Sequence, residues 1–356
     1  MTNRRNFWLW LAAGALAVNL LIGYRVYSGE EAAANENVAF EKVKVMMRVL
    51  HLVQQDYVDP KEVDYESLLY NAIEGMVSSL DPYSSFLDPR EYESMRETTE
   101  GQFGGLGIVV TVRDGTLTVV APIEGTPGSR AGLMAEDRIV KIEGQPTKEK
   151  KLSQAVRLLK GDPGTDVTLT IYRPETDETK TLTIERDVIK VPSVKDTQAI
   201  GDNIGYIRIT QFDERTVDEL KGALSELNSN GMEALILDLR NNPGGLLTSA
   251  VDVASLFLEE GQLVVFTEGR RPSQTTKYFT ENGGFYPDMP VVILTNEGSA
   301  SAAEIVAGCL QDTGRAILVG SKTFGKGSVQ NVIKLQDGSA LRLTTAIYYT
   351  PSRKMI

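Results

Sequence analysis

The chain is poor in the residue types that most often hold metals or act as catalytic bases. Its 356 residues include one cysteine, Cys309, and one histidine, His51. A single cysteine excludes an intrachain disulfide and any CxxC metal or redox motif, and a single histidine excludes a zinc site built from several histidines. We interpret His51, which lies in a helical pattern, as structural. We therefore expect no metal and no cofactor, and a catalytic serine would need a base other than imidazole.

Blocks of basic residues are also missing. The formal net charge is -11, and lysine and arginine are not clustered. Contacts to phosphate backbones require such clusters, so nucleic acid is not an expected partner. With 42% hydrophobic and 24% charged residues, the composition is that of a globular chain with a large core. Its length fits two or three domains.

The longest apolar run stands near the N-terminus. Arg4 and Arg5 precede the run from Phe7 to Gly23, which has the pattern of an export signal. The run is long for a cleaved signal and short for a membrane span, and the A-x-A-like stretch at Ala32–Ala34 lies far downstream. We favour an uncleaved anchor, with a cleaved signal peptide as the alternative. The basic residues predict an exported, periplasmic or extracytoplasmic protein that residues 7–23 anchor in the membrane. Residues 1–35 form this signal and a linker.

A helical N-terminal region is predicted for residues 36–100. The stretches "FEKVKVMMRVLHLVQQDYV" and "YESLLYNAIEGMVSSL" repeat apolar residues at spacings of three and four. Between them and the next helix lies "LDPYSSFLDP", residues 80–89, whose two Asp-Pro pairs favour a turn. We interpret this segment as a structural connector.

A mostly β module is predicted for residues 101–190. Five segments read as short strands, and one helix, "LSQAVRLLKG", interrupts them. The predicted strands are "GGLGIVVTV", "LTVVAPI", "DRIVKIEG", "DVTLTIYR" and "KTLTIER".

Two motifs in this module point to a family. "GLGI", the residues Gly105, Leu106, Gly107 and Ile108, and "SRAGLMAEDRIVKIEG" resemble a PDZ domain of the type found in bacterial proteases. The resemblance implies that the N–H groups of the Gly-x-Gly loop bind the carboxylate of a peptide's free C-terminus, while the peptide adds a strand to the sheet.

Residues 191–356 alternate strands and helices, which predicts a layered α/β domain with a largely parallel sheet. The predicted strands include "NIGYIRITQF", "EALILDL", "LVVF", "VVILT" and "AILVG", and the predicted helices include "TVDELKGALSEL" and "LLTSAVDVASLFLEE". Parallel sheets place binding sites at the carboxyl ends of their strands. Polar, glycine-rich loops follow two of these ends, after Asp238 and after Thr295.

The loop after Thr295, "NEGSAS", leads into a helix that begins near Ser301. Unpaired N–H groups at a helix start stabilise a neighbouring anion, which suits a nucleophilic serine. Ser301 and Glu304 also fit the S-x-x-E capping box. The local pattern therefore leaves open whether Ser299 or Ser301 caps the helix or attacks a substrate.

A base for such a serine could come from "SKTFGKGSVQ". Lys326 lies between two glycines there, and it can act as a base only if burial and positive neighbours lower its pKa. We interpret Lys322 as a solvated surface charge. Gln330 lies four residues beyond Lys326, so a bend at Gly327 would be needed for its amide to reach the amine.

Taken together, "GSASAAEI", "GKGSVQ", "DLRNNPGG" and the PDZ-like module resemble the carboxyl-terminal processing peptidases, which are tail-specific serine proteases. The resemblance spans most of the exported part and implies an α+β multidomain fold with a crotonase/ClpP-like core. It implies Ser301 as nucleophile, Lys326 as general base and Gln330 as the residue that orients the lysine. The oxyanion hole would combine the N–H of Ala302 with that of Gly244 or Gly245.

The resemblance also implies partners. We expect polypeptide substrates with free C-termini, an activating or adaptor protein and a homo-oligomer, and a further segment after Ile356. Asp312 aligns with an acid that matters in some members, and we interpret it as structural. The alternative function is a membrane-tethered peptide-binding protein whose α/β domain is an inactive scaffold.

Overall fold

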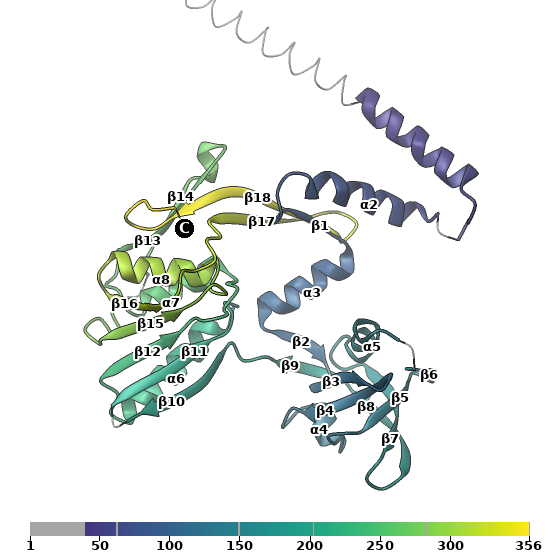
Figure 1. The fold of residues 1–356 in the computed structure, drawn as a ribbon, viewed down its shortest axis with the longest axis horizontal. Helices are drawn as coiled ribbons and strands as arrows, with labels where there is room; N and C mark the ends of the chain where they lie inside the picture. Colours follow the sequence, from purple (N-terminus) through teal and green to yellow (C-terminus); the bar gives the residue numbers. More distant parts are fainter. Residues whose placement is uncertain (1–39, 62, 149, 202, 282, 356) are drawn as a thin grey trace, which may run out of the picture. The chain divides into compact units, whose positions relative to one another are not determined.

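The structure is a computed structural model that describes residues 40–355 except 62, 149, 202 and 282 (Figure 1). The predicted anchor at residues 7–23 lies outside the described residues. Within the described part, no helix is both long and apolar enough to cross a membrane. The chain divides into two compact units, Met1–Leu80 and Asp81–Ile356.

The described part of the first unit is helical, as predicted. Residues 40–56 form one helix, and α2 (Tyr65–Ser78) forms another. The side chain of Asp64 caps α2 because it accepts a hydrogen bond from the Ser67 N–H at 2.9 Å.

The segment interpreted as a connector contains a strand. β1 (Ser85–Leu87) pairs antiparallel with β18 (Ala340–Tyr349), and Ser85 lies opposite Arg342. Asp88 then starts α3 (Pro89–Glu100) with a capping box that it forms with Glu91. The segment therefore joins the C-terminal sheet, which its turn-forming sequence did not indicate.

The five strands predicted for the β module are all present, in the order β3-β4-β5-β7-β8. They are β3 (Ile108–Arg113), β4 (Thr116–Pro122), β5 (Arg138–Ile142), β7 (Asp166–Arg173) and β8 (Glu178–Glu185). Short β6 (Gln145–Pro146) pairs with β5, and β2 (Gln102–Gly105) pairs with β9 (Asp187–Lys190). Helices α4 (Pro127–Arg130) and α5 (Leu152–Leu159) complete the module. β3 stands at the edge of this sheet and contacts α5, and among the described residues its outer side pairs with no strand. Such an edge can accept an added strand.

The C-terminal core is built on the predicted parallel sheet, with strand order β10-β11-β12-β15-β16. Its strands are β10 (Val194–Ile200), β11 (Ile204–Ile209), β12 (Ala234–Asp238), β15 (Val291–Thr295) and β16 (Ala316–Gly320). The last four run parallel, and β10 is antiparallel. Asp238 pairs in register with Leu294, so the loops after β12 and β15 leave the sheet side by side.

One predicted strand lies elsewhere. "LVVF" belongs to β13 (Leu263–Gly269), which is not part of the parallel sheet but pairs antiparallel with β18 and with β14 (Thr276–Phe279). A short 3-10 helix, η1 (Pro272–Gln274), separates β13 from β14, and β17 (Ser328–Lys334) pairs with β18. An apolar strand after a helix resembles another parallel crossover in sequence, and only the strand pairing distinguishes the two sheets.

Three helices pack in this core: α6 (Thr216–Ser229), α7 (Leu247–Ser255) and α8 (Ala302–Asp312). α6 packs on β10 and β11, α8 packs on β16, and both α7 and α8 also pack on β13. Their buried side chains form one hydrophobic cluster, separate from that of the β module. Burial of each large side chain contributes about 1.5–3 kcal/mol, so α8 is firmly held and its N-terminus is fixed.

Candidate active site

Ser301 occupies a strained position at the start of α8. It is the N-cap residue, with φ 55° and ψ -116°, a conformation that residues with a Cβ rarely adopt. Its N–H donates to Glu304 Oε2 at 2.8 Å, which is one half of the predicted capping box. The other half is missing because the Glu304 N–H donates to the backbone oxygen of Ser301 at 2.8 Å. The Ser301 hydroxyl is therefore not used as a cap.

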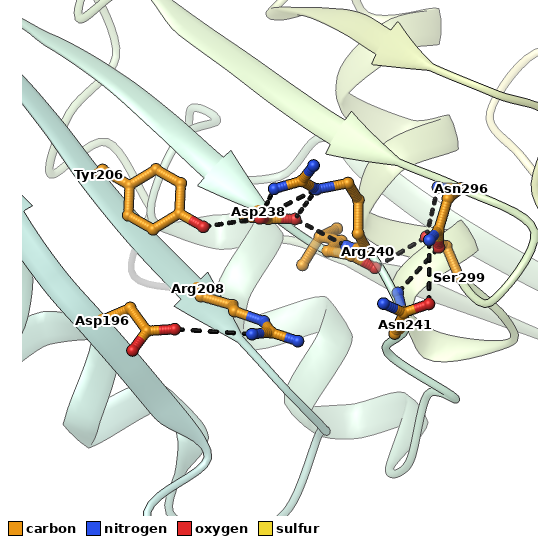
Figure 2. Close-up of polar contacts among 9 residues, drawn as sticks. Asp196, Tyr206, Arg208, Asp238, Arg240, Asn241, Asn296 and Ser299 are labelled. Atoms are coloured by element: carbon orange, nitrogen blue, oxygen red, sulfur yellow. Dashed lines mark hydrogen bonds and ion pairs between the residues drawn. The ribbon is translucent and has the colours of Figure 1, made fainter.

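Ser299 has a different environment. It is fully buried, and its hydroxyl donates to the Leu239 carbonyl at 2.7 Å and accepts from the Asn296 N–H at 3.0 Å. Figure 2 shows this hydroxyl beside Asn296 and Asn241. The sequence did not distinguish the roles of the two serines. In the structure, the Ser299 hydroxyl is the one whose hydrogen bonds hold the loop.

Replacing Ser299 with alanine should therefore reduce stability more than activity. The change removes the hydroxyl that donates to the buried Leu239 carbonyl and accepts the part-buried Asn296 N–H, and loss of these hydrogen bonds costs about 1–3 kcal/mol. We expect the urea midpoint to fall while kcat of the folded fraction stays within a few-fold of the parent. A variant with unchanged stability and no activity would contradict this assignment.

The loop after β12 is fastened to the loop after β15. The Asn241 N–H donates to Asn296 Oδ1 at 2.8 Å, and Asn296 Nδ2 donates to Asn241 Oδ1 at 2.9 Å. In addition, the Ala300 N–H donates to the Asn242 carbonyl at 2.9 Å. These contacts, of which Figure 2 shows those between Asn241 and Asn296, fix the glycine-rich turn against the serine loop.

Asp238 anchors the same turn at the end of β12. Its buried carboxylate accepts from Tyr206 Oη at 2.7 Å and from Arg240 Nη2 at 2.7 Å (Figure 2). Burial acts to raise the pKa of Asp238, but the hydrogen bonds from Arg240 and Tyr206 outweigh it and hold that pKa below its usual value. Asp238 therefore stays ionised and structural near neutral pH.

The structure distinguishes the two glycines of the turn. The Gly244 N–H donates to Asn242 Oδ1 at 2.8 Å, whereas the Gly245 N–H donates to no acceptor among the described residues. The first N–H of α8, on Ala302, is likewise unengaged within the described chain. Gly244, with φ 98°, lies so close to the serine that an added Cβ would be 2.7 Å from Ser301 Cβ. Gly245 and Ala302 thus fit an oxyanion hole better than Gly244 does.

Glu304 connects the serine to the lysine loop. Besides the Ser301 N–H, its carboxylate accepts the Lys326 N–H at 2.9 Å and the Gly325 N–H at 2.7 Å. The residue is only 3% exposed. One buried carboxylate therefore holds the backbones of Ser301 and Lys326 together, a contact between segments that the S-x-x-E pattern did not reveal.

The lysine side chain is half-buried, and its pKa is shifted as the sequence analysis required. Burial lowers the pKa of Lys326, the positive charge of Arg342 lowers it further, and Glu304 opposes them. Lys326 Nζ donates no hydrogen bond to a residue that the structure describes and lies 4.9 Å from the centroid of the Tyr83 ring.

The hydroxyl of Tyr348 donates to the Lys326 carbonyl. Burial raises the pKa of Tyr348, and a hydrogen bond with Ser301 opposes that rise.

Gln330 is near but does not contact the amine. It lies on β17 beside an irregularity in the β17–β18 register, and its Nε2 donates to Ser328 Oγ at 2.9 Å and to Thr344 Oγ1 at 3.4 Å. The structure therefore places Gln330 on the strand that follows Lys326 without a hydrogen bond to Lys326.

The structure also locates three other residues that the sequence singled out. Asp312, at the end of α8, accepts from the Ser352 N–H at 3.1 Å and from Lys354 Nζ at 3.2 Å. Cys309 is buried, and burial raises the pKa of its thiol to about 12. His51 is exposed on the helix of residues 40–56. Among the described residues, no three His, Cys, Asp or Glu side chains gather as metal ligands would.

The GLGI loop has unengaged donors beside the open edge strand. Leu106 is buried, and its carbonyl accepts from the Gly128 N–H at 2.8 Å. The carbonyl of Gly107, which has φ 65°, accepts from the Ile123 N–H at 2.8 Å. The N–H groups of Leu106 and Gly107 donate to no described acceptor, so the loop presents two donors at the start of β3, as carboxylate binding requires.

The fold and the site together describe a serine hydrolase with an attached peptide-binding module. The chain matches peptidase family S41 over residues 203–356, a PDZ domain over residues 118–173 and the N-terminal domain of the activating protease CtpB over residues 23–91.

Similar proteins carry consistent names. The carboxy-terminal-processing protease of Bartonella bacilliformis is 42% identical, over 89% of this chain and 73% of that protein. The carboxyl-terminal-processing protease of a Synechocystis species is 37% identical, over 98% and 84%. The solved structure of a photosystem II D1 C-terminal processing protease is 29% identical, covers 87% of this chain and 88% of its own, and has a TM-score of 0.49. The chain therefore belongs to the carboxyl-terminal processing proteases, the PDZ-containing serine peptidases of family S41.

Proposed function

We propose that this peptidase is an exported endopeptidase in which Lys326 activates Ser301 to cleave polypeptides near their C-termini. The observation that carries the proposal is the Glu304 carboxylate, which accepts the backbone N–H groups of both Ser301 and Lys326. This bridge holds the backbones of the two residues together although they come from different loops, which supports a shared site for their side chains. Incubation of a protein bearing an apolar C-terminal tail with the parent chain and with its Ser301→Ala variant tests it directly.

The proposed reaction begins with proton transfer. Neutral Lys326 Nζ accepts the Ser301 hydroxyl proton while Oγ bonds to the substrate carbonyl carbon. The N–H groups of Ala302 and Gly245 donate to the oxyanion that forms. The Lys326 ammonium then gives its proton to the leaving amine as the peptide bond breaks, and water releases the acyl group.

Gln330 has a supporting role in this proposal. Its Nε2 is engaged by Ser328, while its Oε1 accepts from no donor in the described part of the chain. When the Lys326 amine turns toward Ser301, this oxygen orients it. A neutral amide suits the task because a carboxylate there would raise the pKa of the lysine.

The proposed location is outside the cytoplasm, with residues 7–23 as a membrane anchor and Arg4 and Arg5 retained on the cytoplasmic side. N-terminal sequencing of the mature protein tests the anchor, since a start near Asn35 would show cleavage instead. The activating or adaptor protein and the homo-oligomer stay predictions. The alternative of an inactive peptide-binding scaffold loses its basis because the chain belongs to a serine peptidase family.

The PDZ module is proposed to bind the substrate's free C-terminus, with the tail pairing along β3 and its carboxylate at Leu106 and Gly107. Amidation of the C-terminus of a tailed substrate removes the charge that these N–H groups receive. Because a charged hydrogen bond contributes about 1.5–3 kcal/mol, we expect kcat/KM to fall about ten- to a hundredfold. Equal cleavage of the acid and amide forms would exclude capture of the carboxylate. Binding of both peptides to Ser301→Ala separates recognition from chemistry.

A further inference from the structure

A tyrosine far from Lys326 in the sequence lies against its amine. Lys326 Nζ is 4.9 Å from the centroid of the Tyr83 ring. Tyr83 belongs to the segment that the sequence analysis interpreted as a connector, and β1, which follows it, pairs with β18. The strand pairing therefore brings the ring to the site.

A partly buried hydrogen-bond network fixes the backbone that carries this ring. Asp81 Oδ1 accepts the N–H groups of Tyr83 at 2.8 Å and of Ser84 at 2.9 Å, and Oδ2 accepts the Ser84 hydroxyl at 2.7 Å. From β18, the Thr344 hydroxyl donates to Asp81 at 3.1 Å, and the Thr344 N–H donates to Ser84 Oγ at 3.0 Å. Tyr83 is thus attached to the same strand that carries Tyr348.

This network also reaches Gln330, whose Nε2 lies 3.4 Å from Thr344 Oγ1. Asp81 is therefore linked to two residues near the lysine: to Tyr83 through its N–H, and to Gln330 through Thr344. These hydrogen bonds join the segment of residues 80–89 to residues near Lys326, which a purely connecting segment does not require.

The other groups around the amine come from two further elements, β18 and α8. Arg342 on β18 repels the ammonium, and Glu304 on α8 attracts it. The Glu304 oxygens are already engaged by three backbone N–H groups, of Ser301, Gly325 and Lys326. Tyr348 on β18 is buried and stays uncharged near neutral pH because burial raises its pKa. The face of the Tyr83 ring is therefore a further group that contacts the amine, and it can interact with the ammonium form.

We propose that Tyr83 is a positioning residue for Lys326, whose ring face holds the amine in the site and stabilises the ammonium formed when Lys326 takes the serine proton. The electron-rich face of an aromatic ring attracts a cation more than a neutral amine. The inference rests on the proposed function, in which Lys326 is the base. It assigns the sequence "DPYSS" a role in catalysis rather than in connection alone.

The test compares Tyr83→Phe with Tyr83→Leu in the full chain. The ring face is kept in the first variant and lost in the second, so we expect Tyr83→Phe to match the parent and Tyr83→Leu to lose about tenfold in kcat. The ascending limb of kcat against pH should move to lower pH in Tyr83→Leu, because the ammonium loses a stabilising partner. Phe285→Leu is a matched control, since it removes a ring 5.6 Å from Lys221 Nζ, and it should leave the limb in place.

A purely structural role gives different results. Loss of packing alone would admit water and move the limb to higher pH, so a limb that moves upward or stays fixed in Tyr83→Leu overturns the proposal. Phenylalanines with increasing fluorine content at position 83 keep the shape but weaken the ring's attraction for cations. The limb should move stepwise to lower pH along that series, and a constant limb would overturn the proposal even if Tyr83→Leu were unstable.

The Lys326→Ala variant separates this inference from the proposed function. If Lys326→Ala is inactive while the Tyr83 variants behave as the parent does, only the role of Tyr83 is wrong. If Lys326→Ala retains activity, the lysine is not the base and both proposals fail.

Discussion

Replacement of Ser301 with alanine is expected to abolish peptide cleavage, with kcat reduced by at least about 10⁴-fold. The variant keeps the oxyanion donors but has no oxygen to form the acyl-enzyme. Its thermal midpoint should stay close to that of the parent, because the Ser301 hydroxyl does not cap α8 and the loss is limited to its hydrogen bond with Tyr348. The measurement pairs hydrolysis of a tailed protein substrate with a melting curve. Activity near the parental level would reject Ser301 as the nucleophile.

Ser301→Gly provides a matched comparison. Glycine adopts φ 55° without the strain that any Cβ brings, and release of such strain is worth about 1 kcal/mol or more. We expect Ser301→Gly to be as inactive as Ser301→Ala but to unfold at a higher temperature. Equal melting temperatures for the two variants would show that the site stores no backbone strain at this residue.

The second large effect concerns the base. Lys326→Ala should reduce kcat by about 10³-fold or more, because a positioned base and its proton return are both lost. Lys322→Ala is the matched control: Lys322 lies four residues earlier and is exposed, so the parental rate is expected. Full activity in Lys326→Ala would reject the lysine as base.

The pH dependence tests the same group. In the proposed mechanism the neutral amine is the active form, so kcat should rise as pH increases through the pKa of Lys326, and burial and Arg342 place that pKa below the ordinary lysine value. Arg342→Met removes a positive neighbour, which raises the pKa of Lys326, and the ascending limb should therefore move to higher pH. A parental profile that is flat from about pH 5 to 9 would argue against a lysine base.

The sequence patterns predicted the helices and strands better than they predicted which of these elements pair or pack together. The periods of the apolar residues predicted the strands of the PDZ module near their observed bounds, because period 2 is a local property of the chain. They could not show that β13 pairs with β18 rather than with the parallel sheet. They also could not show that Ser84 meets Thr344 across 260 residues, since such a contact depends on the packing of both sheets.

By itself, the sequence determined the chemical inventory: one histidine, a serine at a helix start, a lysine between glycines and a Gly-x-Gly loop before an edge strand. Only the tertiary structure showed that the Ser299 hydroxyl is buried and hydrogen-bonded within its loop, and that the Gly244 N–H has an acceptor. It also showed that Tyr83, rather than Gln330, lies against the Lys326 amine. The reason is that hydrogen-bond partners and burial are set by segments that meet in space. A motif specifies which groups are present, and the packed core specifies which of them remain unpaired.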